Sequence, residues 1–218
     1  MAETRKPGIG MTVLAMLPWF IYGMFALIQR WNAATISGLI CSLVYVAILS
    51  RHSTIKLMDW TSVAYFAFSV AAVTILRMSS YPLYHVVIVW GFFAVPAWTS
   101  ILARRPFTAA YARETAPPEV WRAPEFERFN VALTLMFALT FTVDAALSGL
   151  AIVTDRPLSL GFVLPMALFI AAMVISRKYP ERFARSLAAE RMLRMTHMMP
   201  ANHSGASRET AEPMRDLV

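Results

Sequence analysis

The sequence has too few charged and cross-linking residues for a soluble protein of this size. Only 15% of its 218 residues are charged and 58% are hydrophobic, whereas a soluble domain has about 25% charged and roughly 45–50% apolar residues. Too few polar side chains remain to cover an apolar core. The single cysteine, Cys41, excludes an internal disulfide. These shortages exclude an ordinary soluble enzyme, a disordered chain and a disulfide scaffold, and they favour an integral membrane protein.

The sequence also lacks the motifs of common catalytic sites. It has only 8 glycines and no glycine-rich phosphate loop, His-Glu-x-x-His, Gly-x-Ser-x-Gly or Cys-x-x-Cys motif. A metal site needs several ligands that converge, and no other histidine is expected near His85. We therefore expect no catalytic residue, metal site or cofactor.

Charged residues divide the chain into six apolar runs, each close to the roughly 20 residues that a membrane-crossing helix needs. No strand alternation typical of an outer-membrane barrel recurs. Within a transmembrane domain of residues 1–179, the predicted spans cover residues 10–29, 33–50, 60–77, 84–103, 130–153 and 158–177. Very short turns after the first, third and fifth spans join the spans in pairs, which predicts an all-α integral membrane protein of three helical hairpins.

The basic residues predict how this bundle is oriented. If the N-terminus is cytoplasmic, only Arg30, Arg77 and Arg156 of the 20 Lys and Arg residues lie in outside turns. Membrane proteins concentrate Lys and Arg on the cytoplasmic side. We therefore expect six transmembrane helices with both termini cytoplasmic. The net charge of +7 then indicates contact with anionic lipids of the inner leaflet. It does not indicate a nucleic acid, because no recognition module is present.

Two segments are expected to lie at the cytoplasmic surface. The longest connection, residues 104–130, carries candidate contacts for lipid phosphate at the interface, which are Arg104, Arg105, Arg113 and Trp121. Residues 180–199 combine apolar positions at helical spacing with arginines, which favours a basic amphipathic helix on the membrane. A partner protein that docks on residues 104–130 or 181–199 is the alternative. Residues 200–218 are expected to be disordered.

Asp144 is the one charged residue near the middle of a predicted span. An aspartate at that depth costs about 2.5–3.5 kcal/mol on insertion scales. Such residues face the bundle interior and often mark a path for ions or protons. Thr140 and Ser148 lie four residues to either side, on the same helix face. Two interpretations remain open: a proton or cation site, and an aspartate that is hydrogen-bonded across helices for structural reasons.

A resemblance to known proteins is confined to about 26 residues of the long connection. The residues concerned are Arg105-Pro106-Phe107-Thr108, Tyr111-Ala112-Arg113, Pro117-Pro118-Glu119, Trp121, Pro124, Phe126 and Asn130. They resemble a loop of small bacterial membrane proteins that are similar in layout to the intracellular septation protein A family. The resemblance implies a bacterial inner-membrane location and a non-catalytic role in cell-envelope organisation or assembly, acting through the loop and tail.

Two further functions remain open. One is a small transporter or channel in which Asp144 is the proton, cation or substrate site. The other is an enzyme acting on lipid headgroups from the inner face, with Arg104, Arg105 and Arg113 holding phosphate. No base or nucleophile can be named for this enzyme.

Overall fold

The computed structural model describes residues 9–114, 116–155 and 159–176, without the side chains of residues 9–13 and 52. Within these ranges the regular structure is entirely helical, which confirms the all-α prediction for this part of the chain. The basic helix predicted for residues 180–199 and the tail 200–218 lie outside the described residues. So do Arg156 and the basic residues near both termini.

Short turns separate the long helices, and two π-helical segments and one 3-10 helix occur among them. In chain order the elements are α1 (Ile9–Leu27), α2 (Trp31–His52), α3 (Leu57–Val70) continued by the π-helix η1 (Ala71–Ile75), α4 (Tyr81–Leu102), α5 (Phe107–Ala112), the 3-10 helix η2 (Pro118–Val120), α6 (Pro124–Val153) and the π-helix η3 (Ser159–Val163). Helix continues from η3 to Ser176, and the segment Ser159–Ser176 is called the last helix below.

Five of the described helices are long and apolar enough to cross a membrane. They are Trp31–Arg51, Leu57–Ile75, Tyr81–Leu102, Pro124–Val153 and Ser159–Ser176, and α1 adds a shorter apolar stretch, Leu14–Leu27. Large apolar side chains such as Phe20, Val95, Leu139 and Ile170 are exposed on these helices. Exposed apolar surface on this scale suits contact with lipid tails rather than water. By helix length and composition the chain is therefore a multi-pass membrane protein.

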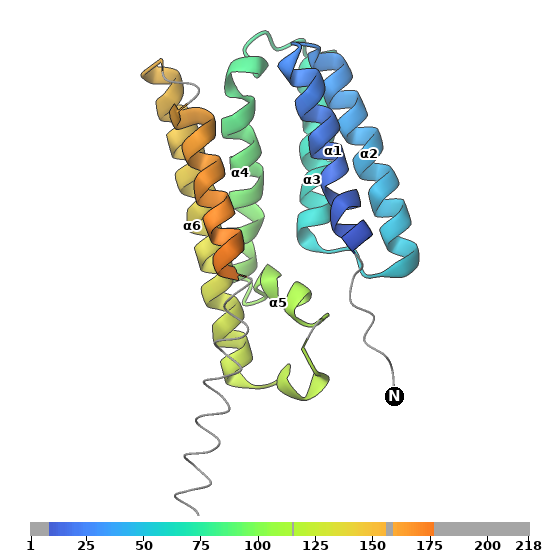
Figure 1. The fold of residues 1–218 in the computed structure, drawn as a ribbon, viewed down its shortest axis with the longest axis vertical. Helices are drawn as coiled ribbons and strands as arrows, with labels where there is room; N and C mark the ends of the chain where they lie inside the picture. The colour runs from blue at the N-terminus through green and yellow to red at the C-terminus, as the bar shows by residue number, and fades with distance from the viewer. Residues whose placement is uncertain (1–8, 115, 156–158, 177–218) are drawn as a thin grey trace, which may run out of the picture. The chain divides into compact units, whose positions relative to one another are not determined.

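Successive long helices run in opposite directions (Figure 1). α2 packs on both α1 and α3, whereas α6 packs on both α4 and the start of the last helix. α3 meets α4 through Phe92, whose ring lies 5.7 Å from that of Tyr65 and 5.3 Å from that of Phe68. The turns after α1, η1 and α6 lie at one end of the bundle, and α5 lies at the other (Figure 1).

The ends of two helices differ from the predicted spans. α6 begins at Pro124, ahead of the predicted span of residues 130–153, as Pro124 in its first turn and the acidic residues Glu125 and Glu127 indicate. α1 ends at Leu27, and Gln29 beyond it adopts a left-handed conformation with φ 57°. Arg104 ends α4 in the same way, with φ 54°. The left-handed residue after a helix is usually glycine. Because Gln29 and Arg104 take this conformation instead, the positions of the glycines in the sequence do not predict where α1 and α4 end.

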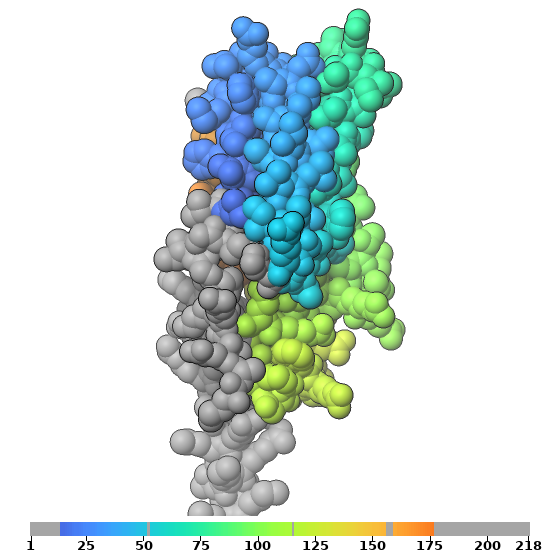
Figure 2. Space-filling view, turned by 90° about the vertical axis from the view of Figure 1, so that its right-hand side faces the viewer, coloured from blue at the N-terminus to red at the C-terminus, as the bar shows by residue number. Residues whose placement is uncertain are grey.

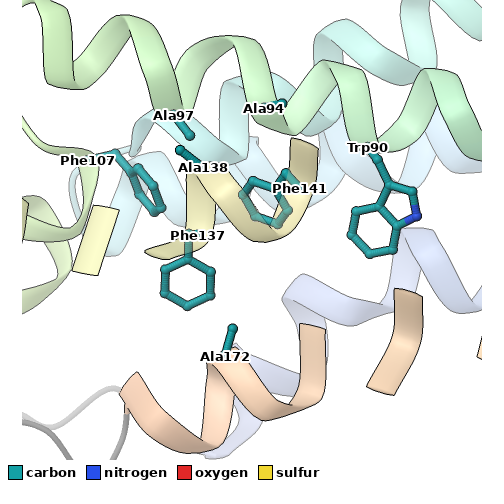
Figure 3. Close-up of a cluster of buried hydrophobic side chains, with 8 residues drawn as sticks. All are labelled: Trp90, Ala94, Ala97, Phe107, Phe137, Ala138, Phe141 and Ala172. Carbon is teal, nitrogen blue, oxygen red and sulfur yellow. The ribbon is translucent and has the colours of Figure 1, made fainter. Parts of the chain in front are cut away.

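The two main apolar clusters lie where the helices pack most closely. One joins α4 and α6 through small residues and aromatic rings, together with Phe107 of α5 and Ala172 of the last helix (Figure 3). Small residues such as Ala97 and Ala138 allow two helices to approach. The other cluster surrounds Tyr65 and Phe66. There Gly38 of α2 lies against Phe66 so closely that a Cβ atom would overlap the ring.

Candidate functional site

Asp144 lies in α6 with a side chain that is 0% exposed. Neither of its carboxylate oxygens has a hydrogen-bond partner among the described residues. Leaving a buried polar group unpaired costs about 1–3 kcal/mol, and more when the group is charged. Buried polar groups in folded proteins nearly always have a partner, so an exception calls for a functional or structural reason.

Asp144 lies on a side of α6 that packs against the last helix. It belongs to a buried stripe of α6 that also contains Phe141 and Ala151. The Phe141 ring lies 6.1 Å from the ring of Phe169, and a Cβ atom on Gly161 would lie 3.2 Å from the Cβ of Ala151. Asp144 falls between these two contacts along the stripe, and we infer from them that the stretch from Gly161 to Phe169 lies opposite it.

The stretch opposite Asp144 is not a regular α-helix. It opens with the π-helix η3, and Pro165 follows with its side chain fully buried. Proline has no amide hydrogen, so Pro165 donates no hydrogen bond to the carbonyl one turn earlier. π-helical turns occur often at functional sites, and carbonyls freed by proline can serve as ligands within a membrane bundle. Pro165 therefore leaves one backbone carbonyl of this segment without its usual donor.

Thr140 and Ser148 do not bind the carboxylate. The Thr140 hydroxyl donates to the carbonyl of Met136 at 2.9 Å, and the Ser148 hydroxyl donates to the backbone carbonyl of Asp144 at 2.7 Å. Both are bonds to the preceding helical turn, which serines and threonines commonly make. Ser148 is buried and Thr140 is half-buried. Among the described residues, no hydrogen bond from another helix reaches Asp144.

The chemistry open to this site is limited by its single carboxyl. No group of three or more His, Cys, Asp or Glu residues that could hold a metal occurs in the described ranges. His85, the histidine considered in the sequence analysis, lies on α4, and its Nδ1 atom lies 2.8 Å from the carbonyl oxygen of Pro82 in the same helix. Calcium requires six to eight oxygen ligands and magnesium six, several of them waters, while zinc needs several His, Cys or carboxylate ligands. A lone carboxyl with neighbouring carbonyls is better suited to a proton or a monovalent cation.

No family model, curated protein or solved structure matches this chain. Its function is therefore inferred from its own residues and their geometry.

The predicted interfacial residues are exposed around the long connection. Arg104, Arg105 and Arg113 are exposed, and Trp121 is 38% exposed. The Trp121 indole N–H donates to the carbonyl of Ala116 at 3.0 Å, which fixes the ring within the connection. Figure 2 shows the connection lying against the lower ends of α2 and α3. These side chains are free to meet lipid headgroups or another protein.

A buried polar network that the sequence analysis missed anchors α5 to α6. The Thr108 hydroxyl donates to the backbone carbonyl of Asn130 at 2.8 Å and lies 2.9 Å from the Thr134 hydroxyl. The amide of Phe107 donates to the Ser100 hydroxyl at 3.3 Å. The sequence feature that could have predicted this network is the pair of polar residues, Asn130 and Thr134, four residues apart in the first half of an apolar helix.

A second missed contact ties α5 to the turn between α2 and α3. The ammonium of Lys56 lies 2.7 Å from a carboxylate oxygen of Glu114 and 4.3 Å from the ring centre of Tyr111. The hydroxyl of Ser53 donates to the same Glu114 oxygen at 3.2 Å. Together the two sets of bonds fix the connection to both halves of the bundle at this end.

At the opposite end, three tyrosines join α1, α3 and α4. The hydroxyl of Tyr65 lies 3.1 Å from those of Tyr22 and Tyr81, which lie 3.3 Å from each other. All three side chains are buried. Each hydroxyl can donate once and accept once within this ring, so the ring satisfies itself and ties the three helices together.

Proposed function

We propose that this chain is a small transporter or channel of the bacterial inner membrane in which Asp144 binds a proton or a monovalent cation. The observation that carries the proposal is the fully buried carboxyl of Asp144, which has no hydrogen-bond partner among the described residues. Intramembrane carboxyls commonly belong to ion or proton paths. The irregular winding of the last helix at η3 and Pro165 supports the proposal, because a carbonyl that loses its donor at proline can serve as a further ligand.

The proposal includes six membrane crossings with both termini in the cytoplasm. The alternating direction of the helices supports it, because the turns that carry Arg30 and Arg77 lie at one end of the bundle (Figure 1). Arg51, Lys56 and the arginines of residues 104–128 lie at the other end. An excess of basic residues at one end supports assigning that end to the cytoplasm. α1 serves as the first crossing although its apolar stretch is the shortest.

The experiment is ion flux into proteoliposomes that contain the full chain. An imposed pH, Na⁺ or K⁺ gradient is followed with an entrapped dye selective for the ion. We expect flux for at least one of these ions, and its loss when Asp144→Asn removes the ionisable group. Asp155→Asn is the matched control, because Asp155 is exposed just beyond the end of the same helix. Its left-handed backbone also suits asparagine.

The outcomes separate a functional carboxyl from a structural one. Loss of flux in Asp144→Asn but not in Asp155→Asn, with both variants folded, supports the site. Flux that is equal in the wild type and Asp144→Asn refutes it.

A second candidate function is the organisation of the cell envelope through the connection of residues 104–130. The exposure of Arg104, Arg105, Arg113 and Trp121 at one end of the bundle favours it. It would agree with the layout shared with the septation protein A family. If deletion of residues 181–218 and replacement of the three arginines by glutamine leave localisation and cross-linked partners unchanged, this role is excluded.

A further inference from the structure

A cleft of about 560 Å³ opens between α1, the first half of α4 and the start of the last helix. This volume falls within the roughly 300–1,000 Å³ typical of ligand sites. Its walls are almost entirely apolar and are rich in aromatic rings, including Trp19, Trp31, Trp90 and Phe162. The helices that form it belong to the apolar, membrane-crossing part of the chain. A ligand in this cleft would therefore be largely apolar.

Trp90 adds one polar atom to this apolar wall. Its side chain is 9% exposed, and its indole nitrogen has no hydrogen-bond partner in the described ranges. Figure 3 shows that nitrogen on the side of the indole turned away from Phe137 and Phe141 of the apolar cluster. Indole can only donate a hydrogen bond. Among the donors on the side chains that line the cleft, the indole N–H of Trp90 is the buried one without a partner in the described residues, and a matching ligand carries an acceptor such as a carbonyl oxygen partway along an apolar body.

The mouth of the cleft is cationic. A second hollow, of about 370 Å³, surrounds the turn between α1 and α2 and shares Gln29 and Trp31 with the cleft. Arg30 and Asn32 complete it. The indole N–H of Trp31 donates to the Gln29 side chain at 3.0 Å, which holds the shared wall in place. Arg30 is exposed and has no ion pair within the described part of the chain.

The spacing of these groups matches a glycerophospholipid. Trp31 contacts the rings of Tyr81 and His85, so the mouth lies level with the start of α4. At 1.5 Å per residue, Trp90 lies about 8 Å deeper along that helix than His85 and about 13 Å deeper than Tyr81. An arginine side chain and a glycerol phosphate together span such a distance. We infer that the cleft binds a membrane phospholipid, with the phosphate on Arg30, an ester carbonyl on Trp90 and an acyl chain against the aromatic wall.

The leaflet follows from the proposed topology, in which the α1–α2 turn faces away from the cytoplasm. The lipid would then come from the outer leaflet. The binding itself depends on neither that topology nor ion transport by Asp144, which is absent from the lining of the cleft. Failure of one proposal therefore leaves the other standing.

Filling the cleft tests the inference without removing any contact. Gly23 lines the cleft, and a Cβ atom there would meet nothing within 4 Å. Gly23→Leu therefore places a side chain in the space of the acyl chain. Gly91→Leu is the matched control, because Gly91 is also helical with open space around its Cβ but does not line the cleft. The full chain is purified in mild detergent, stripped of lipid and titrated with palmitoyl-oleoyl phosphatidylglycerol, and native mass spectrometry counts the lipids bound.

Two substitutions test the polar contacts in the same assay. Trp90→Phe keeps an aromatic ring but removes the donor, and its control is Trp98→Phe, whose indole N–H is already bonded to Thr142 at 3.0 Å. Arg30→Gln removes the cation, and its control is Arg77→Gln in another turn at the same end. Loss of a charge-assisted contact should weaken binding about tenfold, and loss of the neutral hydrogen bond somewhat less.

We expect one tightly held lipid in the wild type, its loss in Gly23→Leu and its retention in Gly91→Leu. Inorganic phosphate alone should not compete, because the acyl chain supplies most of the contact. If Gly23→Leu binds as the wild type does, the cleft holds no lipid and the inference is wrong. It is equally wrong if Arg30→Gln and Arg77→Gln weaken binding to the same degree, since that would indicate only general attraction of lipid to basic turns.

Discussion

The hydroxyl of Thr108 donates a 2.8 Å hydrogen bond to the backbone carbonyl of Asn130, and this bond fixes α5 against α6. The bond is buried, as are both residues. It closes the long connection back onto the bundle rather than leaving it as a free loop. What remains for lipid or protein partners is the outer surface that carries Arg104, Arg105 and Arg113.

Thr108→Val tests the importance of this bond. Valine keeps the shape of threonine, but it removes the hydroxyl that bonds the carbonyl of Asn130 and lies against the hydroxyl of Thr134. An unpaired buried group costs about 1–3 kcal/mol, so thermal unfolding in detergent should occur at a lower temperature. Thr99→Val is the control, since Thr99 is exposed and bonds only to its own helix. Equal unfolding temperatures for the two variants would contradict the assignment.

Glu114→Gln tests the attachment of α5 to the turn between α2 and α3. The substitution removes the ion pair with Lys56, whose side chain is 11% exposed against 30% for Glu114. For a partly exposed pair the loss should be about 1 kcal/mol or less, and the connection should open more often. Limited trypsin digestion after Arg113 should therefore become faster. Glu119→Gln, at an exposed position in η2, should leave the cleavage rate unchanged. An equal effect of both substitutions would show that the ion pair between Lys56 and Glu114 does not attach α5 to the turn.

Gly38→Ala tests the close approach of α2 and α3. A methyl group at this position overlaps the ring of Phe66, which is fully buried and cannot move aside. Overpacking of this kind costs about 1–3 kcal/mol. Gly149→Ala introduces the same methyl group into open space and should be neutral or stabilising. The comparison is made by thermal unfolding, and a destabilisation shared by both variants would show that steric overlap is not the cause.

The helical architecture could be predicted from the sequence because it depends on local composition. Charged residues bracket the apolar runs, and Pro124 followed by Glu125 and Glu127 indicates the start of α6. Helix ends such as Gln29 were harder to predict, because the left-handed residue there is not glycine. The burial of Asp144 followed from its central place in an apolar run.

Contacts between distant segments could not be predicted from the sequence alone. Thr108 and Thr134 are ordinary residues in their own helices, and only the path of the connection brings their hydroxyls together. Lys56 and Glu114 meet because the turn after α2 and the end of α5 lie at one end of the bundle. For Asp144 the sequence left open whether another helix bonds to its carboxyl. That question depends on packing, and within the described residues no such bond is made.

The central claim is that the carboxyl of Asp144 serves binding rather than the stability of the fold. The most direct measurement is the thermal unfolding of Asp144→Val in lipid nanodiscs, beside the wild type. Valine is close to aspartate in size and removes a buried carboxyl that has no partner among the described residues. We predict an unchanged or higher unfolding temperature, because replacing an unpaired buried polar group is stabilising by about 1 kcal/mol or more. A clear fall in the unfolding temperature would mean that the carboxyl holds the bundle together, and would contradict the account.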